Sequence, residues 1–426
     1  MYREEHLKAL LEGRRILLAG YGREGKSSER LVRQLLPDAD ITIVEGNDNI
    51  KVEAAKGYDL ILKSPGIPTF VFEGLCDLNT ITSQTDLFLQ VYGSQTIGVT
   101  GTKGKSTTTN LIADLLRSKF PQTIMAGNMG IPLFDIIPQI EEDTPVVCEF
   151  SCHQLENIHR APHIGVLLNL FQEHLDHYHS YRDYQLAKLQ IGLKQQKDDV
   201  FYYCTDNEEL RQLVTELKPE MKGTILPYGI GMPLAQELSH CERKLQGEHN
   251  LSNIAVAYMV AEQMGLEREE ILDVVARFNG LEHRMELVGT YHDITFYNDS
   301  ISTIPAACIA AVEALKNVNS LILGGFDRGI DYSILGRYLA EHTIQNLVFV
   351  GAAGLRIKEE MMKILGDNSC ASNVLVESDY TKIIPWIFSH TQPGTICLLS
   401  PAAASYDAFK NFEERGRVYK DLVRGQ

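Results

Sequence analysis

A glycine-rich loop between a predicted strand and a predicted helix constrains the fold more than any other feature. The run GVTGTKGKST (98–107) follows an apolar strand predicted at 96–100 and leads into a helix predicted from about residue 106. Glycines let backbone N–H groups approach phosphate oxygens, and the helix N-terminus adds positive potential. Lys105 can reach the β and γ phosphates, and Ser106 can ligate Mg2+. The spacing is GxxGxxGKS, because Val99 stands where the strict motif has glycine. The loop predicts an α/β domain that binds a nucleotide phosphate.

A second glycine pattern lies near the N-terminus. Gly20, Gly22 and Gly25 follow an apolar strand predicted at 16–19, and Glu45 ends a second strand predicted at 41–44. With the amphipathic stretch between them, the two strands predict a parallel βαβ unit with a right-handed crossover. This is a dinucleotide-binding pattern, but the same geometry binds other diphosphates. It indicates a nucleotide-like ligand without selecting nicotinamide.

The alternation of strands and helices restarts twice along the 426 residues, which is longer than one core usually supports. The restarts near residues 92 and 289 predict three α/β domains: a Rossmann-like domain at 1–91, a central P-loop domain with a parallel sheet at 92–288, and a Rossmann-like domain at 289–426. Further strands are predicted at 60–62, 145–148, 164–168, 294–297, 321–323, 346–350 and 395–399, with helices at 184–193 and 250–264.

Composition narrows the class of partner. A net charge of −16 argues against binding to a nucleic-acid backbone or an anionic membrane surface, although local cations can still bind small anions. No apolar run approaches the roughly 20 residues of a membrane-spanning helix, and the charged N-terminal run does not resemble a secretory signal. We therefore expect a cytoplasmic protein. The 8 scattered cysteines form no CxxC pair, so neither zinc nor a redox dithiol is indicated.

Three further positions are candidates for metal chemistry. Glu149 follows the strand predicted at 145–148 and could hold Mg2+ opposite Ser106, although a solvated strand-end carboxylate is the competing interpretation. The run 173–179, EHLDHYH, is rich in potential ligands, but its spacing is not HExxH and zinc is not favoured. Lys188 lies on the helix predicted at 184–193, where a lysine is ordinarily solvated.

The order of these motifs resembles the Mur ligase family over essentially the whole chain. The family's TGTxGKS/T loop stands at 100–106. The helix with Lys188 matches the position where the family carries a carbamylated lysine that ligates Mg2+. The other matching segments are 127–130, 149–155, 169–174, 247–253, 281–286 and 298–300.

Within the family, the C-terminal third resembles the members that add glutamate to UDP-N-acetylmuramoyl-L-alanine. The run SPAAASYDAFKNFEERG (400–416) is similar to their C-terminal signature, and GGFDRG (324–329) to their glycine-rich turn. Arg328 and Ile301 stand where those members usually have lysine, and cysteine is usual at or beside Ala403. A planar guanidinium is not equivalent to an ammonium, so the enantiomer of glutamate stays open, with D-glutamate expected.

The resemblance implies that ATP phosphorylates the alanine carboxylate and that the glutamate amine attacks the acyl phosphate. It implies catalytic roles for Lys105, Glu149, His174 and carbamylated Lys188. One Mg2+ would be held by Ser106 and Glu149, and a second by His174 and Lys188. The expected ATP contacts are Gly101, Thr102, Lys103, Gly104, Lys105, Ser106, Thr107, Asn253, Arg284 and Asp299.

The resemblance also places the other two substrates. The uridine diphosphate would contact Gly20, Gly22, Gly25, Glu45, Ser64 and Gly66, and the muramoyl group Asn128 and Ser151. The incoming glutamate would contact Thr303, Arg328, Ser405 and Phe412. We expect a monomer.

Three alternatives remain at the level of sequence. An NAD-dependent oxidoreductase would use the N-terminal glycines but leaves the loop with Lys105 unexplained. A folylpolyglutamate-type ligase shares the central loop but should lack the C-terminal run. Another Mur-type ligase, or a Mur-like amidating partner, would use a different amino acid or amine donor.

Overall fold

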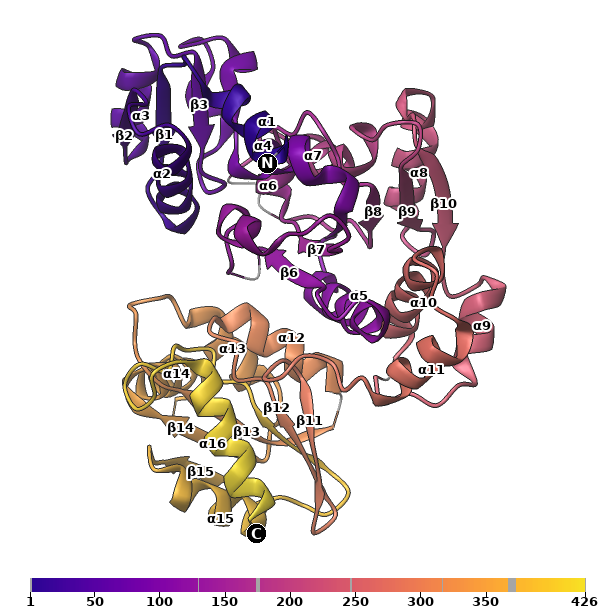
Figure 1. The fold of residues 1–426 in the computed structure, drawn as a ribbon. Helices are drawn as coiled ribbons and strands as arrows, with labels where there is room; N and C mark the ends of the chain where they lie inside the picture. The colour runs from indigo at the N-terminus through magenta and orange to yellow at the C-terminus, as the bar shows by residue number, and fades with distance from the viewer. Residues whose placement is uncertain are drawn as a thin grey trace. The chain divides into compact units, whose positions relative to one another are not determined.

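The computed structural model describes residues 2–128, 130–173, 177–245, 247–315, 317–366 and 373–425. The chain forms two compact units, Met1–Phe278 and Asn279–Gln426 (Figure 1). The first unit contains a four-stranded and a six-stranded sheet, and the second contains another six-stranded sheet. The α/β class with three sheet-based domains agrees with the prediction, while the exact boundaries at residues 92 and 289 stay predictions.

The N-terminal sheet has the order β2-β1-β3-β4, and its strands are parallel. Its strands are β1 (Ile16–Ala19), β2 (Ile41–Val44), β3 (Leu60–Lys63) and β4 (Ile81–Thr82). Its helices are α1 (Tyr2–Leu11), α2 (Arg23–Leu35), α3 (Asn47–Ala54) and α4 (Gln84–Tyr92). β1 lies inside the sheet and is buried along its length, which is why its sequence is uniformly apolar.

The central sheet has the order β10-β9-β8-β5-β7-β6, and all its strands are parallel. Its strands are β5 (Thr96–Thr100), β6 (Ile124–Gly127), β7 (Val146–Glu149), β8 (Ile164–Leu167), β9 (Val200–Cys204) and β10 (Thr224–Tyr228). The helices are α5 (Lys105–Lys119), α6 (Cys152–Leu155), α7 (Tyr181–Leu193), α8 (Glu208–Leu217), α9 (Pro233–Ser239), α10 (Glu248–Gln263) and α11 (Arg268–Arg277). Helix α5, which begins at the glycine loop, packs against α10 and α11.

The C-terminal sheet has the order β11-β12-β16-β13-β14-β15. Its strands are β11 (Glu286–Tyr291), β12 (Ile294–Asn298), β13 (Val318–Gly324), β14 (Asn346–Val350), β15 (Asn373–Val376) and β16 (Ile396–Leu399). Its helices are α12 (Pro305–Leu315), α13 (Ser333–Glu341), α14 (Gly351–Leu365), α15 (Tyr380–His390) and α16 (Phe412–Arg424). Helix α16 packs across β11 and β12 (Figure 1).

One strand of this sheet departs from the parallel arrangement that the sequence predicts. β11 pairs with β12 antiparallel, whereas the other pairs are parallel. The two-residue connection consists of His292 and Asp293, with φ of 50° and 63°. Two successive positive φ angles form the tight turn that suits a hairpin. Turns of this kind prefer Asn-Gly or Asp-Gly, so the sequence His-Asp does not by itself predict a hairpin.

Buried polar contacts connect the N-terminal sheet to the central part of the same unit. Lys63 at the end of β3 is 2% exposed, and its Nζ donates to Glu156 Oε2 at 2.9 Å. Burial disfavours the charged form of Glu156, but the contact with His177 at 3.6 Å and the hydrogen bond from Lys63 hold its pKa at about 2. Removing either partner would leave the other charge buried without compensation, so this pair fixes the two sheets to each other.

Within the described ranges, no helix is long and apolar enough to cross a membrane.

Candidate active site

The glycine loop positions an ammonium group at the start of α5. Gly104 precedes the helix with φ of 84°, a left-handed conformation that favours glycine. Lys105, the first residue of α5, donates from Nζ to the carbonyl oxygens of Gly101 and Thr102, both at 2.9 Å. Ser106 and Thr107 occupy the first helical turn. The loop thus combines a lysine, helix N–H groups and the positive end of the helix dipole, which together favour a phosphate.

Two residues that the sequence analysis did not assign hold this loop in place. Asn169, just after β8, accepts at Oδ1 from the Lys103 N–H at 2.8 Å and donates from Nδ2 to the Lys103 carbonyl at 3.0 Å. Tyr184 on α7 shares a hydrogen bond of 2.8 Å with the Thr102 hydroxyl. Asn169 could have been found from its place at the carboxyl end of a predicted strand, where α/β sites form. The contact of Tyr184 is long-range and has no local signal.

Lys188 lies beside the same loop. Its side chain on α7 is buried, and Nζ donates to the Gly101 carbonyl at 2.9 Å. Burial lowers the pKa of Lys188 to about 8, and the nearby charge of Lys105 acts in the same direction. One carbonyl oxygen therefore accepts from both lysines. Two cations so close together repel each other, which distinguishes Lys188 from the solvated lysine that its helix alone suggests.

Glu149 lies at the edge of the sheet from which the loop leaves. It ends β7, next to β5 in the sheet, and is paired in register with Val99. Asn128 donates from Nδ2 to Glu149 Oε1 at 2.7 Å. In the part of the chain that the structure describes, Oε2 is buried and has no hydrogen-bond partner. An unsatisfied buried carboxylate oxygen is costly, and an oxygen of this kind is what Mg2+ prefers.

The predicted second metal ligand cannot be placed in the same way. His174 lies outside the described residues. Among those that are described, no group of three or more His, Cys, Asp or Glu side chains is arranged to hold a metal. The buried, unbonded Oε2 of Glu149 is the oxygen in the described part of this region that could accept a cation.

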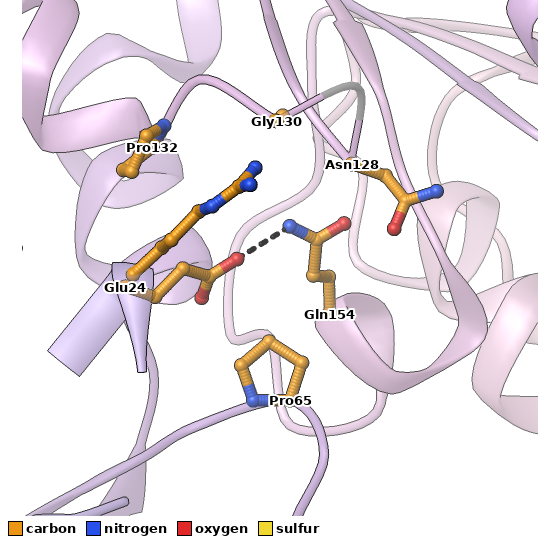
Figure 2. A pocket seen from close by; sticks show the side chains of 8 residues that line it. Glu24, Pro65, Asn128, Gly130, Pro132 and Gln154 are labelled. Carbon is orange, nitrogen blue, oxygen red and sulfur yellow. Dashed lines mark hydrogen bonds between the residues drawn. The ribbon is translucent and has the colours of Figure 1, made fainter. Parts of the chain in front are cut away.

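A cavity of about 210 Å³ adjoins this region in the first unit. Figure 2 shows Glu24 and Gln154 pointing toward each other, joined by a hydrogen bond of 2.8 Å from Gln154 Nε2 to Glu24 Oε1. Burial raises the pKa of Glu24. The cavity is lined by Arg23, Glu24, Pro65, Gly127, Asn128, Gly130, Pro132 and Gln154. It extends from Arg23 and Glu24 of the N-terminal glycine loop to Asn128.

Gln154 and Arg23 were not assigned from sequence, although Gln154 has a local signal. It is the last residue of an S-x-x-Q capping box, at helix position N3, in which Ser151 Oγ accepts from the Gln154 N–H at 3.2 Å. Ser151, predicted to contact the muramoyl group, is thus the N-cap of α6 beside the cavity. The capping box fixes the position of the Gln154 side chain, which lines the cavity.

The remaining N-terminal candidates divide into two groups. Gly20 and Gly25 form the turn after β1, where a Cβ on Gly25 would lie 2.3 Å from the Gly20 carbonyl oxygen. Ser64 Oγ donates to that carbonyl at 3.0 Å, and Gly22 caps α2. Glu45 and Gly66 are exposed and do not line the cavity.

The predicted ATP contacts outside the loop fall in different units. Asn253 on α10 lies against the loop, since a Cβ on Gly104 would be 3.1 Å from its Nδ2. Asp299 belongs to the second unit, where it accepts from the Ser400 hydroxyl at 2.7 Å. Burial raises the pKa of Asp299, while the charge of Arg284 opposes this. Arg284 is therefore close enough to Asp299 for its charge to act on that carboxylate, while the contact of both residues with ATP stays a prediction.

Three of the four predicted glutamate contacts, Thr303, Arg328 and Ser405, lie on loops of the second unit. Arg328 Nη2 donates to the Thr303 carbonyl at 3.1 Å. The Phe326 N–H donates to the Ala404 carbonyl at 2.9 Å, which brings Ser405 to the turn that carries Arg328. These loops follow β12, β13 and β16, whose carboxyl ends meet at one edge of the sheet.

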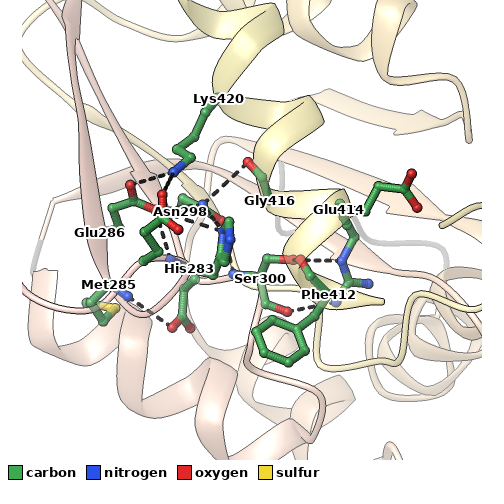
Figure 3. Close-up of polar contacts among 12 residues, drawn as sticks. His283, Met285, Glu286, Asn298, Ser300, Phe412, Glu414, Gly416 and Lys420 are labelled. Atoms are coloured by element: carbon green, nitrogen blue, oxygen red, sulfur yellow. Dashed lines mark hydrogen bonds and ion pairs between the residues drawn. The ribbon is translucent and has the colours of Figure 1, made fainter. Parts of the chain in front are cut away.

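Phe412 joins this group through its backbone. It is the first residue of α16, and its carbonyl oxygen accepts from the Ser300 hydroxyl at 2.8 Å (Figure 3). All four predicted glutamate contacts thus lie on segments that are bonded to one another.

Comparisons with known proteins show which family the chain belongs to. The Mur ligase middle domain matches residues 99–261, and the Mur ligase, glutamate ligase domain matches residues 283–403. The chain is 32% identical to UDP-N-acetylmuramoylalanine–D-glutamate ligase of Desulfitobacterium hafniense, over 97% of this chain and 98% of that protein. It is 31% identical to the protein of the same name in Listeria innocua, over 93% of this chain and 89% of that one.

Solved structures show the same fold at low sequence identity. MurF from Acinetobacter baumannii aligns with a TM-score of 0.54 and 17% identity, covering 96% of this chain and 90% of that one. MurF from Thermotoga maritima in complex with ADP aligns with a TM-score of 0.55 and 14% identity, covering 96% and 95%. From the domain matches and the near full-length relatives, the chain belongs to the Mur ligase family.

Proposed function

We propose that the chain is an ATP-dependent ligase that joins D-glutamate to UDP-N-acetylmuramoyl-L-alanine in cytoplasmic peptidoglycan precursor synthesis. The observation that carries the proposal is the glycine loop of α5, with Lys105 inside it and Glu149 at the same sheet edge. The names of the relatives support the choice of substrates. The fit of the C-terminal third to the glutamate ligase domain supports the choice of amino acid.

The chemistry explains why such a loop is needed. A carboxylate is a poor electrophile, so its oxygen first attacks the γ phosphorus of ATP and ADP leaves. The glutamate nitrogen then attacks the acyl carbon, loses a proton and displaces inorganic phosphate. In the first step two anions approach each other, and positive charge must neutralise the transferring group. Lys105 and the N-terminus of α5 supply that charge.

Mg2+ fits the donor atoms beside the loop. Ser106 and Glu149 would hold one ion, with Asn128 orienting the Glu149 carboxylate. His174 and Lys188 would hold a second. A bound Mg2+ supplies neutralising charge to the phosphate oxygens. The unsatisfied Oε2 of Glu149 supports the first site.

Carbamylation of Lys188 would resolve the crowding of cations at the Gly101 carbonyl. As an ammonium, Lys188 repels both Lys105 and Mg2+. Addition of its neutral amine to CO2, with loss of a proton, would give a carbamate, which is an anionic oxygen ligand. Its burial next to the loop supports this role, because a carbamate there would face the phosphates and metal rather than solvent.

Two further regions of the chain suit the other two substrates, the UDP-sugar and glutamate. The cavity between Arg23 and Asn128 suits the UDP-sugar, whose alanine end must reach the loop. The bonded loops around Arg328 and Ser405 suit glutamate. Acyl phosphates hydrolyse in water, so we infer that the reactants are brought together in a site closed to solvent.

A direct assay tests the proposal. Phosphate release would be measured with ATP, Mg2+, UDP-N-acetylmuramoyl-L-alanine and a panel of amino acids that includes both glutamate enantiomers. We expect release that depends on the UDP-sugar and D-glutamate together. Release with another amino acid or with ammonia alone would indicate a different Mur-type activity. Absence of ATP-dependent release with every acceptor would contradict the proposal.

Arg328 provides a sharper test of the glutamate pocket. Arg328→Ala should raise the KM for D-glutamate about tenfold or more, because a charge-assisted hydrogen bond contributes about 1.5–3 kcal/mol. The KM values for ATP and the UDP-sugar should stay within a few fold of wild type, because the lost contact binds glutamate alone. Arg328→Lys should restore part of the loss.

Arg337→Ala, at an exposed arginine on α13 of the same unit, is the matched control and should leave all three KM values unchanged. An unchanged glutamate KM in Arg328→Ala, or a defect confined to ATP, would mean that the pocket is wrongly assigned.

A further inference from the structure

The most deeply buried arginine of the second unit has no carboxylate partner. Arg415, on α16, is 1% exposed. Within the described ranges of this unit, no carboxylate lies within ion-pair distance of it; its guanidinium instead donates five hydrogen bonds, four of them to backbone carbonyls. Burial lowers the pKa of Arg415. Burying a cation with no carboxylate in ion-pair contact is expensive, and Asp407 acts on it only from a longer distance, so these contacts call for an explanation beyond ordinary packing.

Each acceptor belongs to a loop that carries a predicted site residue. Nε donates to the Ser300 hydroxyl at 3.0 Å and Nη2 to the Ser300 carbonyl at 2.8 Å, next to Asp299. Nη2 also donates to the Ala403 carbonyl at 3.1 Å, and Nη1 to the Ala404 carbonyl at 3.2 Å, directly before Ser405.

The third loop is the glycine-rich turn that leads to Arg328. Nη1 of Arg415 lies 3.5 Å from the Gly324 carbonyl at the end of β13. A Cβ on Gly325 would lie 2.3 Å from the Ala404 oxygen and 3.0 Å from Arg415 Nη1, so the turn packs directly on the guanidinium. The Ser300 hydroxyl accepts a hydrogen bond from Arg415 Nε. It donates in turn to the Phe412 carbonyl (Figure 3).

We propose that Arg415 is a positioning residue that sets the three loops of the amino-acid site in register, without touching the substrate. The inference rests on the proposed function for the identity of the substrate. The loops follow three different strands, and in the described residues one side chain bonds to all of them. Misplacement of these loops by a fraction of an ångström is enough to disturb recognition of a small substrate.

The geometry also explains why the residue is an arginine. Guanidinium presents five N–H donors in a rigid plane, which matches the five bonds observed. A lysine has three donors on a flexible stem and would leave buried carbonyls unsatisfied. Arg415→Lys keeps the charge and most of the volume but cannot hold all three loops.

The test compares Arg415→Lys and Arg415→Ala with Lys420→Met. Lys420 lies on the same helix, is buried and pairs with Glu286 at 2.8 Å, and among the described residues its side chain makes no direct hydrogen bond to the three loops. We expect both Arg415 variants to raise the KM for D-glutamate at least about tenfold, with a much smaller change in the KM for the UDP-sugar. Methylguanidinium should restore part of the affinity in Arg415→Ala. Lys420→Met should lower the melting temperature comparably while leaving the glutamate KM unchanged.

Hydrogen exchange without any substrate separates this inference from the proposed function. Faster exchange at 299–303, 324–329 and 402–406 in Arg415→Lys, together with no ligation by the wild type, would retain the positioning role and reject the function. Wild-type exchange in those segments, or a glutamate KM in folded Arg415 variants no higher than in Lys420→Met, would overturn the inference. If Arg415→Ala does not fold, Arg415→Lys carries both measurements.

Discussion

Lys105→Ala is expected to reduce ligation at least about a thousandfold while the protein stays folded. The Lys105 ammonium lies inside the glycine loop, bonded to two of its carbonyls, where it can move onto the β and γ phosphates. Losing one preorganised charge or donor at a developing anion typically costs about a hundredfold to a thousandfold in kcat. Here the cation also offsets the repulsion between the carboxylate and ATP, so we expect a loss of kcat at the upper end of this range. Initial rates of phosphate release and a melting curve would be measured together.

Lys119→Ala provides the matched control, because this lysine ends the same helix and is remote from the loop. Its rates should equal those of the wild type. Wild-type turnover by a folded Lys105→Ala variant would remove phosphate activation from this loop. A loss of activity accompanied by a lower melting temperature in Lys105→Ala alone would indicate a structural role instead.

The strands that the sequence predicted best are those with both faces covered. β1, β5 and β14 are buried along their whole length and mostly apolar because helices pack on both sides of a parallel sheet, and their bounds agree with the prediction. Two of the edge strands are harder to recognise, although the edge strand β2 was predicted with its observed bounds. β15 alternates half-buried and exposed residues, and β10 contains Pro227, which an edge strand tolerates. Neither was predicted, because partial burial demands no continuous apolar run.

The same distinction applies to the site. The glycine loop was predictable because its residues are adjacent in the chain. The strand before it and the helix after it can also be recognised from the neighbouring sequence. Contacts such as Asn169 to Lys103, or Gln154 to Glu24, join residues that are far apart, and only the tertiary fold brings them together. The role of Arg415 depends on three separate loops, so a single sequence cannot reveal it.

Lys188→Ala should lower turnover at least about a hundredfold and regain part of it when short carboxylic acids such as acetate are added. The reason is the position of the side chain, which reaches the Gly101 carbonyl from α7 beside the phosphate loop. If Lys188 acts as a carbamate, its loss removes an anionic oxygen from the second metal site. Removing the side chain also leaves space in which a small carboxylate can supply an equivalent oxygen. Rates would be measured across acetate and formate concentrations at constant ionic strength.

Two control variants make the result specific to the oxygen ligand. Lys194→Ala, at an exposed lysine that follows α7, should keep wild-type rates with or without acid. Lys105→Ala should not respond to acid, because it lacks a cation rather than an anion. Full activity of Lys188→Ala without additive would reject the metal role. Rescue by ethylamine but not by acetate would show that Lys188 works as an ammonium, and the cations at Gly101 would then both serve the phosphates directly.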